Sequence, residues 1–274
     1  MKSLVLENVR NSCFINSTLQ MLYEVDEFRQ FILSLGISEN SQTTYPICSA
    51  LYKLFVNERK QNANHLRYTM AFLDQECAMY DDGTMHDAEE FLVSLFKLLE
   101  IELSISPPGM QILDLFRGTY ITGRKFIGSQ DGSCVNCRNF PGSESLETFF
   151  FLNLNMPDIM RNQSLSDLIQ NEFTQPSDRY TAKCSSCCRC VPGQGCVCPQ
   201  REVADVKTLI TGPKYLLVKL LRYNSRGEKN TCFIPSMDFF KFDNQDQTYA
   251  IQCIMDHIGL SVNAGHWILH KKRQ

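Results

Sequence analysis

The sequence lacks any stretch of about 18 consecutive apolar residues, so no transmembrane helix is expected. Its first dozen residues, MKSLVLENVRNS, hold no apolar run long enough for a secretory signal peptide. An excess of basic residues is also missing: 27 Lys and Arg stand against 30 Asp and Glu, for a formal net charge of −3. A general nucleic-acid binder is usually basic. We therefore expect neither nucleic acid nor a membrane among the partners.

Cysteine is plentiful among the 274 residues but unevenly placed. Of 13 cysteines, eight lie between Cys134 and Cys198, and the other five are scattered singly. The odd total, the C-x2-C pairs and the missing signal peptide favour reduced thiols and metal binding over a disulfide scaffold. The expected compartment is therefore the cytoplasm, the nucleus or both.

Hydrophobic periodicity predicts helices first and strands later. Residues 11–24 and 86–100 carry apolar stripes at helical spacing, and residues 45–75 look mostly helical. Ser12 stands where it can cap the first helix. After residue 110 the pattern changes to short aromatic and aliphatic runs typical of strands, at residues 149–152, 215–221 and 249–254. This order predicts an α+β protein.

Two C-x2-C pairs form a candidate metal site, Cys134 with Cys137 and Cys184 with Cys187. Four thiolates can complete a closed tetrahedral shell around structural zinc. The alternative is four unpaired structural cysteines. Further cysteines at positions 188, 190, 196 and 198 leave the register of the second pair open, and they could bind a second zinc.

Cys13 stands at a predicted helix start, where amide groups and the helix dipole favour the nucleophilic thiolate. The amides of Asn8 and Asn11, just before it, can donate to a developing oxyanion. His266 precedes a predicted strand and can act as the base. Most single cysteines are nevertheless inert and buried, and most histidines are not bases.

Several motifs together resemble the ubiquitin-specific protease family. LENVRNSCFINSTLQ, residues 6–20, resembles the family's cysteine box, G-L-x-N-x-G-N-T-C-Y-M-N-S-x-L-Q. HDAEEFL, residues 86–92, resembles Q-x-D-A-x-E-F, and residues 249–267 resemble the histidine box. The C-x2-C pairs match the order of the family's zinc-bearing fingers. The resemblance covers nearly the whole chain.

The resemblance implies a papain-like cysteine protease fold with palm, thumb and zinc-bearing fingers subdomains. Residues 1–274 would form one catalytic domain, with the fingers inserted at about 117–225 and a truncated C-terminal end. The implied activity is thiol-dependent hydrolysis of the isopeptide bond after the C-terminal Gly of ubiquitin, with ubiquitin and ubiquitinated proteins as partners. The implied roles are nucleophile for Cys13, general base for His266, oxyanion donor for Asn8, and substrate binding for Asp87, His257, Gly259 and Gly265.

Charge agrees with a basic ubiquitin tail as ligand, because no Lys or Arg occurs between Tyr68 and Phe96. That stretch holds seven acids: Asp74, Glu76, Asp81, Asp82, Asp87, Glu89 and Glu90. A solvated loop and helix face is the more common explanation of such a run. Only Asp87 is singled out by the resemblance.

Several positions depart from the family pattern. Arg10 replaces a Gly, Met85 and His86 stand where a Gln is expected, and Trp267 replaces a Tyr. The eight residues after His266 include no Asp or Asn to orient the imidazole. Three readings follow: an active deubiquitinase, a catalytically weak ubiquitin-binding scaffold of the same fold, or a zinc-stabilised interaction or nucleic-acid module.

Overall fold

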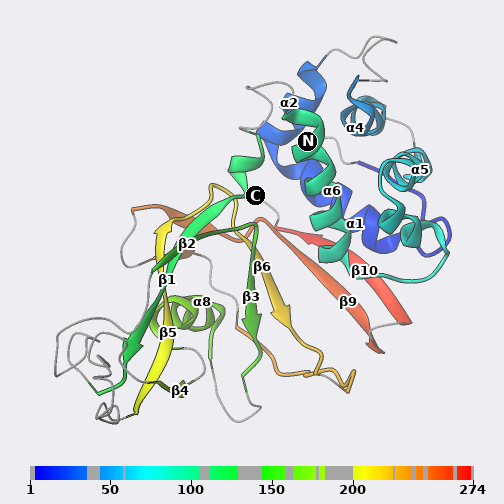
Figure 1. Ribbon diagram of the computed structural model, residues 1–274. Helices are drawn as coiled ribbons and strands as arrows, with labels where there is room; N and C mark the ends of the chain where they lie inside the picture. The colour runs from blue at the N-terminus through cyan, green and yellow to red at the C-terminus, as the bar shows by residue number, and fades with distance from the viewer. Residues whose placement is uncertain are drawn as a thin grey trace, which may run out of the picture. The chain divides into compact units, whose positions relative to one another are not determined.

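The computed structural model describes residues 4–35, 44–57, 60–104, 112–128, 144–157, 163–176, 179–182, 200–224, 226–235, 239–242, 246–261 and 264–272. The chain forms two compact units (Figure 1). The first comprises Met1–Leu115, Arg222–Thr231 and Ile251–Gln274, and the second comprises Phe116–Leu221 and Cys232–Ala250. The cysteines expected to bind zinc, Cys134, Cys137, Cys184 and Cys187, lie outside the described residues. The mixed helix and sheet content expected from the sequence is confirmed.

Helices make up most of the first unit. They are α1 (Cys13–Glu24), α2 (Asp26–Ser34), α4 (Pro46–Val56), α5 (Asn64–Leu73), the 3-10 turn η1 (Gln75–Asp81), α6 (Ala88–Leu103) and the short turn η2 (Leu113–Leu115). The stripe predicted for α6 is confirmed, because Phe91, Leu95 and Leu99 are completely buried. Ile15 and Leu19 of α1 are buried to the same extent, so these two helices contribute the centre of the core.

A two-stranded ribbon completes the first unit. Strand β9 (Cys253–Ser261) pairs antiparallel with β10 (Ala264–Lys271), with Trp267 opposite His257 and a register shift between Ala264 and His266. The ribbon lies beside α1, although nearly the whole chain separates α1 from β10 (Figure 1). Packing of the first helix on the last strand therefore brings the two ends of the sequence together.

The second unit is built on a four-stranded antiparallel sheet of order β2-β1-β5-β4. Its strands are β1 (Gly118–Phe126), β2 (Ser145–Phe149), β4 (Arg179–Ala182) and β5 (Arg201–Thr211). Further elements are β3 (Phe151–Asn155) parallel to β6 (Leu217–Leu221), β7 (Phe239–Lys241) paired with β8 (Thr248–Ala250), and the helix α8 (Leu165–Thr174). The aromatic run at 149–152 is split between β2 and β3 by a bend at Phe150.

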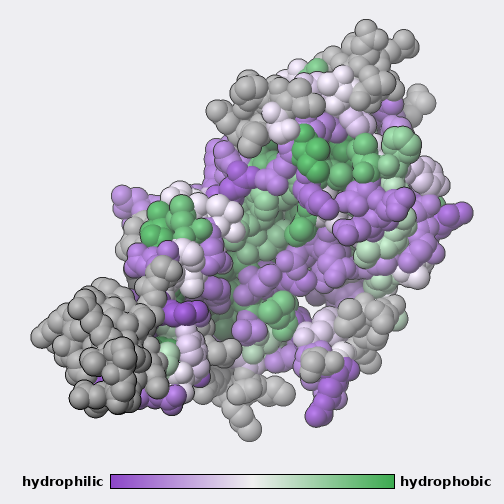
Figure 2. Space-filling model, in the orientation of Figure 1, coloured by the Kyte–Doolittle hydropathy of each residue, from purple (hydrophilic) through white to green (hydrophobic). Residues whose placement is uncertain are grey.

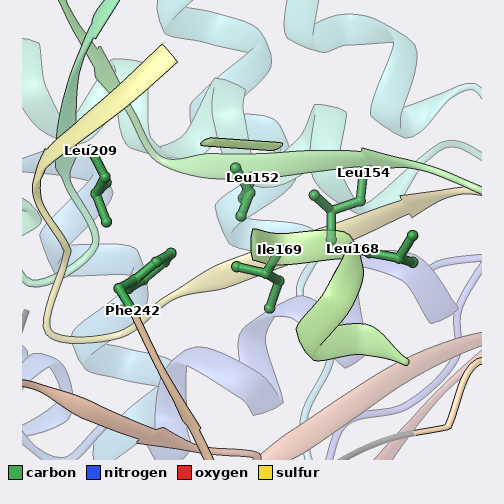
Figure 3. Packing of buried hydrophobic residues seen from close by; sticks show 6 residues of the cluster. All are labelled: Leu152, Leu154, Leu168, Ile169, Leu209 and Phe242. Carbon is green, nitrogen blue, oxygen red and sulfur yellow. The ribbon is translucent and has the colours of Figure 1, made fainter. Parts of the chain in front are cut away.

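A separate hydrophobic core holds this second unit together. Figure 3 shows how β3, α8 and β5 contribute to it. Its buried members are Leu152, Leu154, Leu168, Ile169, Leu209 and Phe242. Helix α8 is fixed at its start by a capping box between Ser164 and Asp167, which satisfies amides that the helix would otherwise leave unpaired.

The visible surface of the described residues is mostly hydrophilic, with small apolar areas between polar ones (Figure 2). Phe72 and Phe233 are the most exposed large apolar side chains. Among the described helices, none has enough apolar residues in a row to cross a lipid bilayer.

Candidate active site

The turn that leads into Cys13 has an unusual backbone. Arg10 and Asn11 have positive φ angles of 50° and 56°, in the left-handed region. This conformation costs about 1–2 kcal/mol at Arg10, whereas asparagine adopts it more readily. The resemblance placed a Gly at the position of Arg10, and glycine adopts this conformation without that cost. The departure at Arg10 is therefore accommodated with backbone strain.

Ser12 and Cys13 complete the turn. The predicted cap by Ser12 is wrong. Ser12 occupies the N-cap position, but its side chain makes no hydrogen bond to a helix amide. Its hydroxyl instead accepts from the Val9 N–H at 3.0 Å and lies 3.4 Å from Asn8 Oδ1. Cys13 is only 4% exposed, and its Sγ lies 3.9 Å from the Asn11 carbonyl oxygen. Asn8 is exposed beside this turn.

Two contacts connect the turn to the segment between η1 and α6. The Asn11 side-chain amide donates to the Gly83 carbonyl at 2.9 Å, so it is already engaged. Arg67, on α5 and only 1% exposed, donates to the Val9 carbonyl at 3.4 Å and forms an ion pair with Asp81. The turn before Cys13 is thus held against residues 81–83.

Asp87 opens α6 as its N-cap residue. Its Oδ1 accepts from the Glu89 N–H at 2.7 Å, which satisfies one of the amides unpaired at a helix start. Other acids of the 68–96 stretch have local partners: Asp74 accepts from Lys97 at 3.0 Å, and Asp82 accepts from the Thr84 N–H at 2.6 Å. These carboxylates therefore support the local fold.

His257, in the middle of β9, is 7% exposed and has contacts on several sides. Its Nδ1 lies 2.8 Å from the Tyr223 hydroxyl, and its Nε2 lies 3.4 Å from the sulfur of Met85. Burial and the nearby Lys229 lower the pKa of His257, while Asp256 and Asp87 act in the opposite direction. The Lys229 ammonium donates to the carbonyls of residues 257 and 259 at 2.6 and 3.1 Å.

Gly259 and Gly265 lie where side chains have no room. A β-carbon on Gly259 would come within 2.4 Å of the Ala264 carbonyl oxygen. A β-carbon on Gly265 would come within 2.4 Å of His257 Nε2 and 2.5 Å of the Ile258 carbonyl. The residues expected to bind substrate are therefore gathered: both glycines touch His257, whose ring also lies within electrostatic range of Asp87.

Helix α1 packs against β10, and one ion pair joins the C-terminal ends of the two elements. Lys271 forms this ion pair with Glu24. The helix rises about 1.5 Å per residue and the strand about 3.3 Å. The eleven steps along the helix from Cys13 to Glu24 and the five steps along the strand from His266 to Lys271 both span about 16.5 Å. The stretch of β10 from His266 to Lys271 is therefore as long as α1.

The imidazole of His266 is nevertheless not engaged with the thiol. His266 pairs with Ile258, one position from the Trp267–His257 pair, so its side chain leaves the ribbon on the opposite face and is exposed. Within the described part of the chain, no hydrogen bond joins Cys13 Sγ to His266. Catalytic hydrogen bonds are often long or absent without substrate and form only in the complex.

Sequence reasoning missed the buried Arg67, and also Tyr223 and Lys229 beside His257. A signal for Arg67 existed: Ala63, Leu66, Arg67 and Met70 have the i, i+3, i+4, i+7 spacing of one helix face. That face is buried, so the arginine lies inside the unit. No comparable pattern marks Tyr223 or Lys229, which reach His257 only through the fold.

A cysteine thus opens a helix that packs on a histidine-bearing strand, as expected for a papain-like fold. The fold is similar to that of two solved structures. One is the SAGA DUB module Ubp8/Sgf11/Sus1/Sgf73 bound to monoubiquitin, with a TM-score of 0.72, 19% identity, and coverage of 99% of this chain and 61% of that one. The other is the same module bound to ubiquitin aldehyde, with a TM-score of 0.73, 18% identity, and coverage of 100% and 62%.

Sequence comparison identifies the family. The model of the family described as "Ubiquitin carboxyl-terminal hydrolase" matches residues 5–274, and the chain belongs to this family. Ubiquitin carboxyl-terminal hydrolase 26 of Oryza sativa subsp. japonica is 28% identical over 97% of this chain. Ubiquitin carboxyl-terminal hydrolase 36 of Drosophila ananassae is 25% identical over 95% of it. The chain spans 24% of the length of each of these two relatives.

Proposed function

We propose that this chain is the catalytic domain of a cysteine-type deubiquitinase, a thiol protease that hydrolyses the isopeptide bond after the C-terminal Gly of ubiquitin. One observation carries the proposal: in a chain matched by the family over residues 5–274, Cys13 opens the helix that packs beside the strand bearing His266. The partners would be ubiquitin and ubiquitinated proteins. The relatives and the ubiquitin-bound neighbours support this substrate class.

The proposed chemistry follows from the placement of these groups. His266 takes the thiol proton of Cys13, and the thiolate attacks the carbonyl carbon of the terminal glycine. The amide of Asn8 donates to the oxyanion, since its oxygen faces Ser12 and leaves the NH2 group available. Protonated His266 then gives its proton to the leaving lysine amine, and water hydrolyses the thioester. This sequence requires His266 to turn toward Cys13 when substrate binds.

The group around His257 is suited to an extended glycine-rich peptide. Gly259 and Gly265 offer backbone without side chains, and Asp87 supplies a negative charge for the basic residues of a ubiquitin tail. We assign substrate binding to Asp87, His257, Gly259 and Gly265, with the two glycines bracketing a loop over the tail.

Structural zinc in the fingers is part of the proposal. Within the described residues, no group of three or more His, Cys, Asp or Glu is placed to hold a metal ion. The four cysteines Cys134, Cys137, Cys184 and Cys187 are a donor set suited to tetrahedral zinc. The first pair falls between β1 and β2 and the second between β4 and β5.

The sheet register favours a meeting of these two pairs. Phe126 at the end of β1 pairs with Val203 near the start of β5, and Ala182 at the end of β4 pairs with Arg201. Both connections therefore leave the same end of one sheet. Metal analysis by mass spectrometry should find zinc in the natural chain and a loss of it in Cys137→Ser. Equal zinc in both proteins would contradict this assignment.

A second candidate function is a catalytically weak ubiquitin-binding scaffold of the same fold. The observation that favours it is the missing hydrogen bond between Cys13 and His266 among the described residues, with His266 exposed on the outer face of the ribbon. Such a protein would bind ubiquitin without turning it over.

Turnover of a fluorogenic ubiquitin–coumarin conjugate tests the proposed function. We expect the natural chain to release coumarin and both Cys13→Ala and His266→Ala to lose about a thousandfold or more in kcat. His270→Ala is the matched control, because His270 is also exposed and lies on the same face of β10. Ubiquitin binding without coumarin release by the natural chain would instead establish the scaffold.

A further inference from the structure

The turn at residues 9–11 is held by contacts that come from outside it. Arg10 and Asn11 both keep left-handed backbone angles, which asparagine tolerates but arginine disfavours. The Val9 carbonyl accepts from Arg67 at 3.4 Å, and Asn11 donates to Gly83 at 2.9 Å. A strained segment persists only where its surroundings fix it.

Arg67 is the buried member of these contacts. It is 1% exposed and belongs to α5, on the face that packs into the first unit. Its guanidinium is neutralised by Asp81, the last residue of η1, and its Nε has no partner within the part of the chain that the structure describes. Burial of an arginine whose guanidinium is incompletely hydrogen-bonded destabilises the folded state. Hydrophobic packing alone therefore does not explain why an arginine occupies this position.

The same ion pair joins two segments that carry site residues. Val9 follows Asn8 and begins the turn that leads to Cys13, and Asp81 begins the stretch that runs through Gly83 to Asp87. Arg10 also approaches the Asp81 carboxylate, at 4.0 Å. Arg67 therefore holds the turn that presents the nucleophile against the segment that presents the substrate-binding carboxylate.

We propose that Arg67, through its bond to the Val9 carbonyl and its ion pair with Asp81, is a positioning residue that fixes Cys13 and Asn8 relative to Asp87. Arg67 itself touches neither substrate nor reacting atoms. The catalytic consequence rests on the proposed function, whereas the effect on the turn does not.

The test uses the full chain and compares Arg67→Met, Arg67→Lys and Asp81→Asn. Glu102→Gln is the matched control, because Glu102 is another buried charged residue of the first unit that contacts backbone amides. Iodoacetamide alkylation, mapped by peptide mass spectrometry, gives the rates at Cys13 and at the buried Cys48 in the same protein. Kinetics on ubiquitin–coumarin give kcat and KM separately.

Loss of the Arg67 contacts should expose the Cys13 thiol to solvent and displace it from its position for catalysis. In Arg67→Met we expect the Cys13-to-Cys48 ratio of alkylation rates to rise about tenfold, while kcat falls about tenfold or more with little change in KM. Arg67→Lys, which retains a charge and a donor, should restore part of both values. In Glu102→Gln we expect no rise in the Cys13-to-Cys48 ratio of alkylation rates and a kcat within about twofold of that of the natural chain.

Two results would overturn the proposal. One is a parallel rise of Cys13 and Cys48 alkylation in Arg67→Met, which a general loss of stability would produce. The other is a fall of kcat no greater than in Glu102→Gln. If Arg67→Met does not fold, Arg67→Lys and Asp81→Asn are judged by the same criteria. If the natural chain shows no turnover, the alkylation ratio alone decides, and the proposed function fails separately.

Discussion

The ring of His257 lies where the side chain of residue 265 would be, because a β-carbon on Gly265 would come within 2.4 Å of its Nε2. The Ile258 carbonyl is almost as close, at 2.5 Å, and a backbone group cannot rotate away. The ribbon at this point therefore requires glycine for packing reasons, independently of any substrate.

Gly265→Ala should consequently destabilise the first unit by about 1–3 kcal/mol, as overpacking does in a well-filled site. Urea denaturation measures the change. The matched control is Gly123→Ala in β1, where an added β-carbon would meet only the flexible Glu144 side chain at 3.4 Å. If Gly265→Ala lowers the free energy of unfolding no more than Gly123→Ala does, the steric conflict inferred at Gly265 is contradicted.

Arg10 offers a test of backbone strain before Cys13. Both Arg10→Gly and Arg10→Ala remove the exposed side chain and its 4.0 Å approach to Asp81, but only glycine relaxes the φ of 50°. We expect Arg10→Gly to be more stable than Arg10→Ala by about 1 kcal/mol, even though glycine gains entropy on unfolding. Thermal midpoints of the two variants compare them directly. Equal midpoints would mean that the turn relaxes by another route.

The stability of the first unit should depend on the protonation of His257. Burial and Lys229 lower its folded pKa below the ordinary value of 6.5, so the unfolded chain binds the proton more tightly. The stability contributed by neutral His257 is present above about pH 6.5 and is lost as pH falls through the folded pKa. Denaturation at several pH values should show this loss in the natural chain and a smaller one in His257→Gln. Parallel pH profiles would contradict it.

Glu102 should give a pH dependence of the opposite sign. Its carboxylate accepts from the Ile47 and Cys48 amides at 2.7 and 2.8 Å, at the start of α4, where Tyr45 provides no side-chain cap. Burial raises the pKa of Glu102 above its ordinary 4.5, against the lowering effect of those amides.

The stability contributed by Glu102 is therefore fullest below about pH 4.5 and declines as pH rises through the folded pKa. We expect the stability advantage of the natural chain over Glu102→Gln to shrink between pH 4.5 and 7, measured by urea denaturation. An advantage that grows over this range would show that the amide bonds outweigh burial.

The helices of the first unit could be predicted because their apolar residues repeat at helical spacing. Ala88, Phe91, Leu92, Leu95, Phe96 and Leu99 were expected on one stripe, and all are buried. The charged residues on such stripes were harder to interpret. Glu102 falls seven residues after Leu95, and Arg67 falls on the same helix face as Leu66, so the spacing places both on buried faces. Their charge argues for exposure, because charged side chains are seldom buried unless they have partners. Those partners, the α4 amides and Asp81, lie elsewhere in the sequence.

The motifs predict which residues belong to the site, but they do not predict its geometry. The motifs named Cys13, Asp87, His257 and the two glycines, but the facing directions of His257 and His266 depend on the register of β9 with β10. A shift of one residue would exchange the two faces, and although a glycine within a strand is typical of a bulge, it does not determine which residues pair. The hydroxyl of Ser12 illustrates the same limit, since Val9 and the helix amides compete for it.

The central claim is that Cys13 is the nucleophile of a ubiquitin-directed thiol protease, and covalent trapping with a ubiquitin vinyl-sulfone probe tests it most directly. We predict one ubiquitin adduct on the natural chain and on Cys77→Ala, a control for another buried thiol of the same unit, and none on Cys13→Ala. Absence of an adduct on a natural chain that still binds ubiquitin, or an adduct that persists in Cys13→Ala, would contradict the claim.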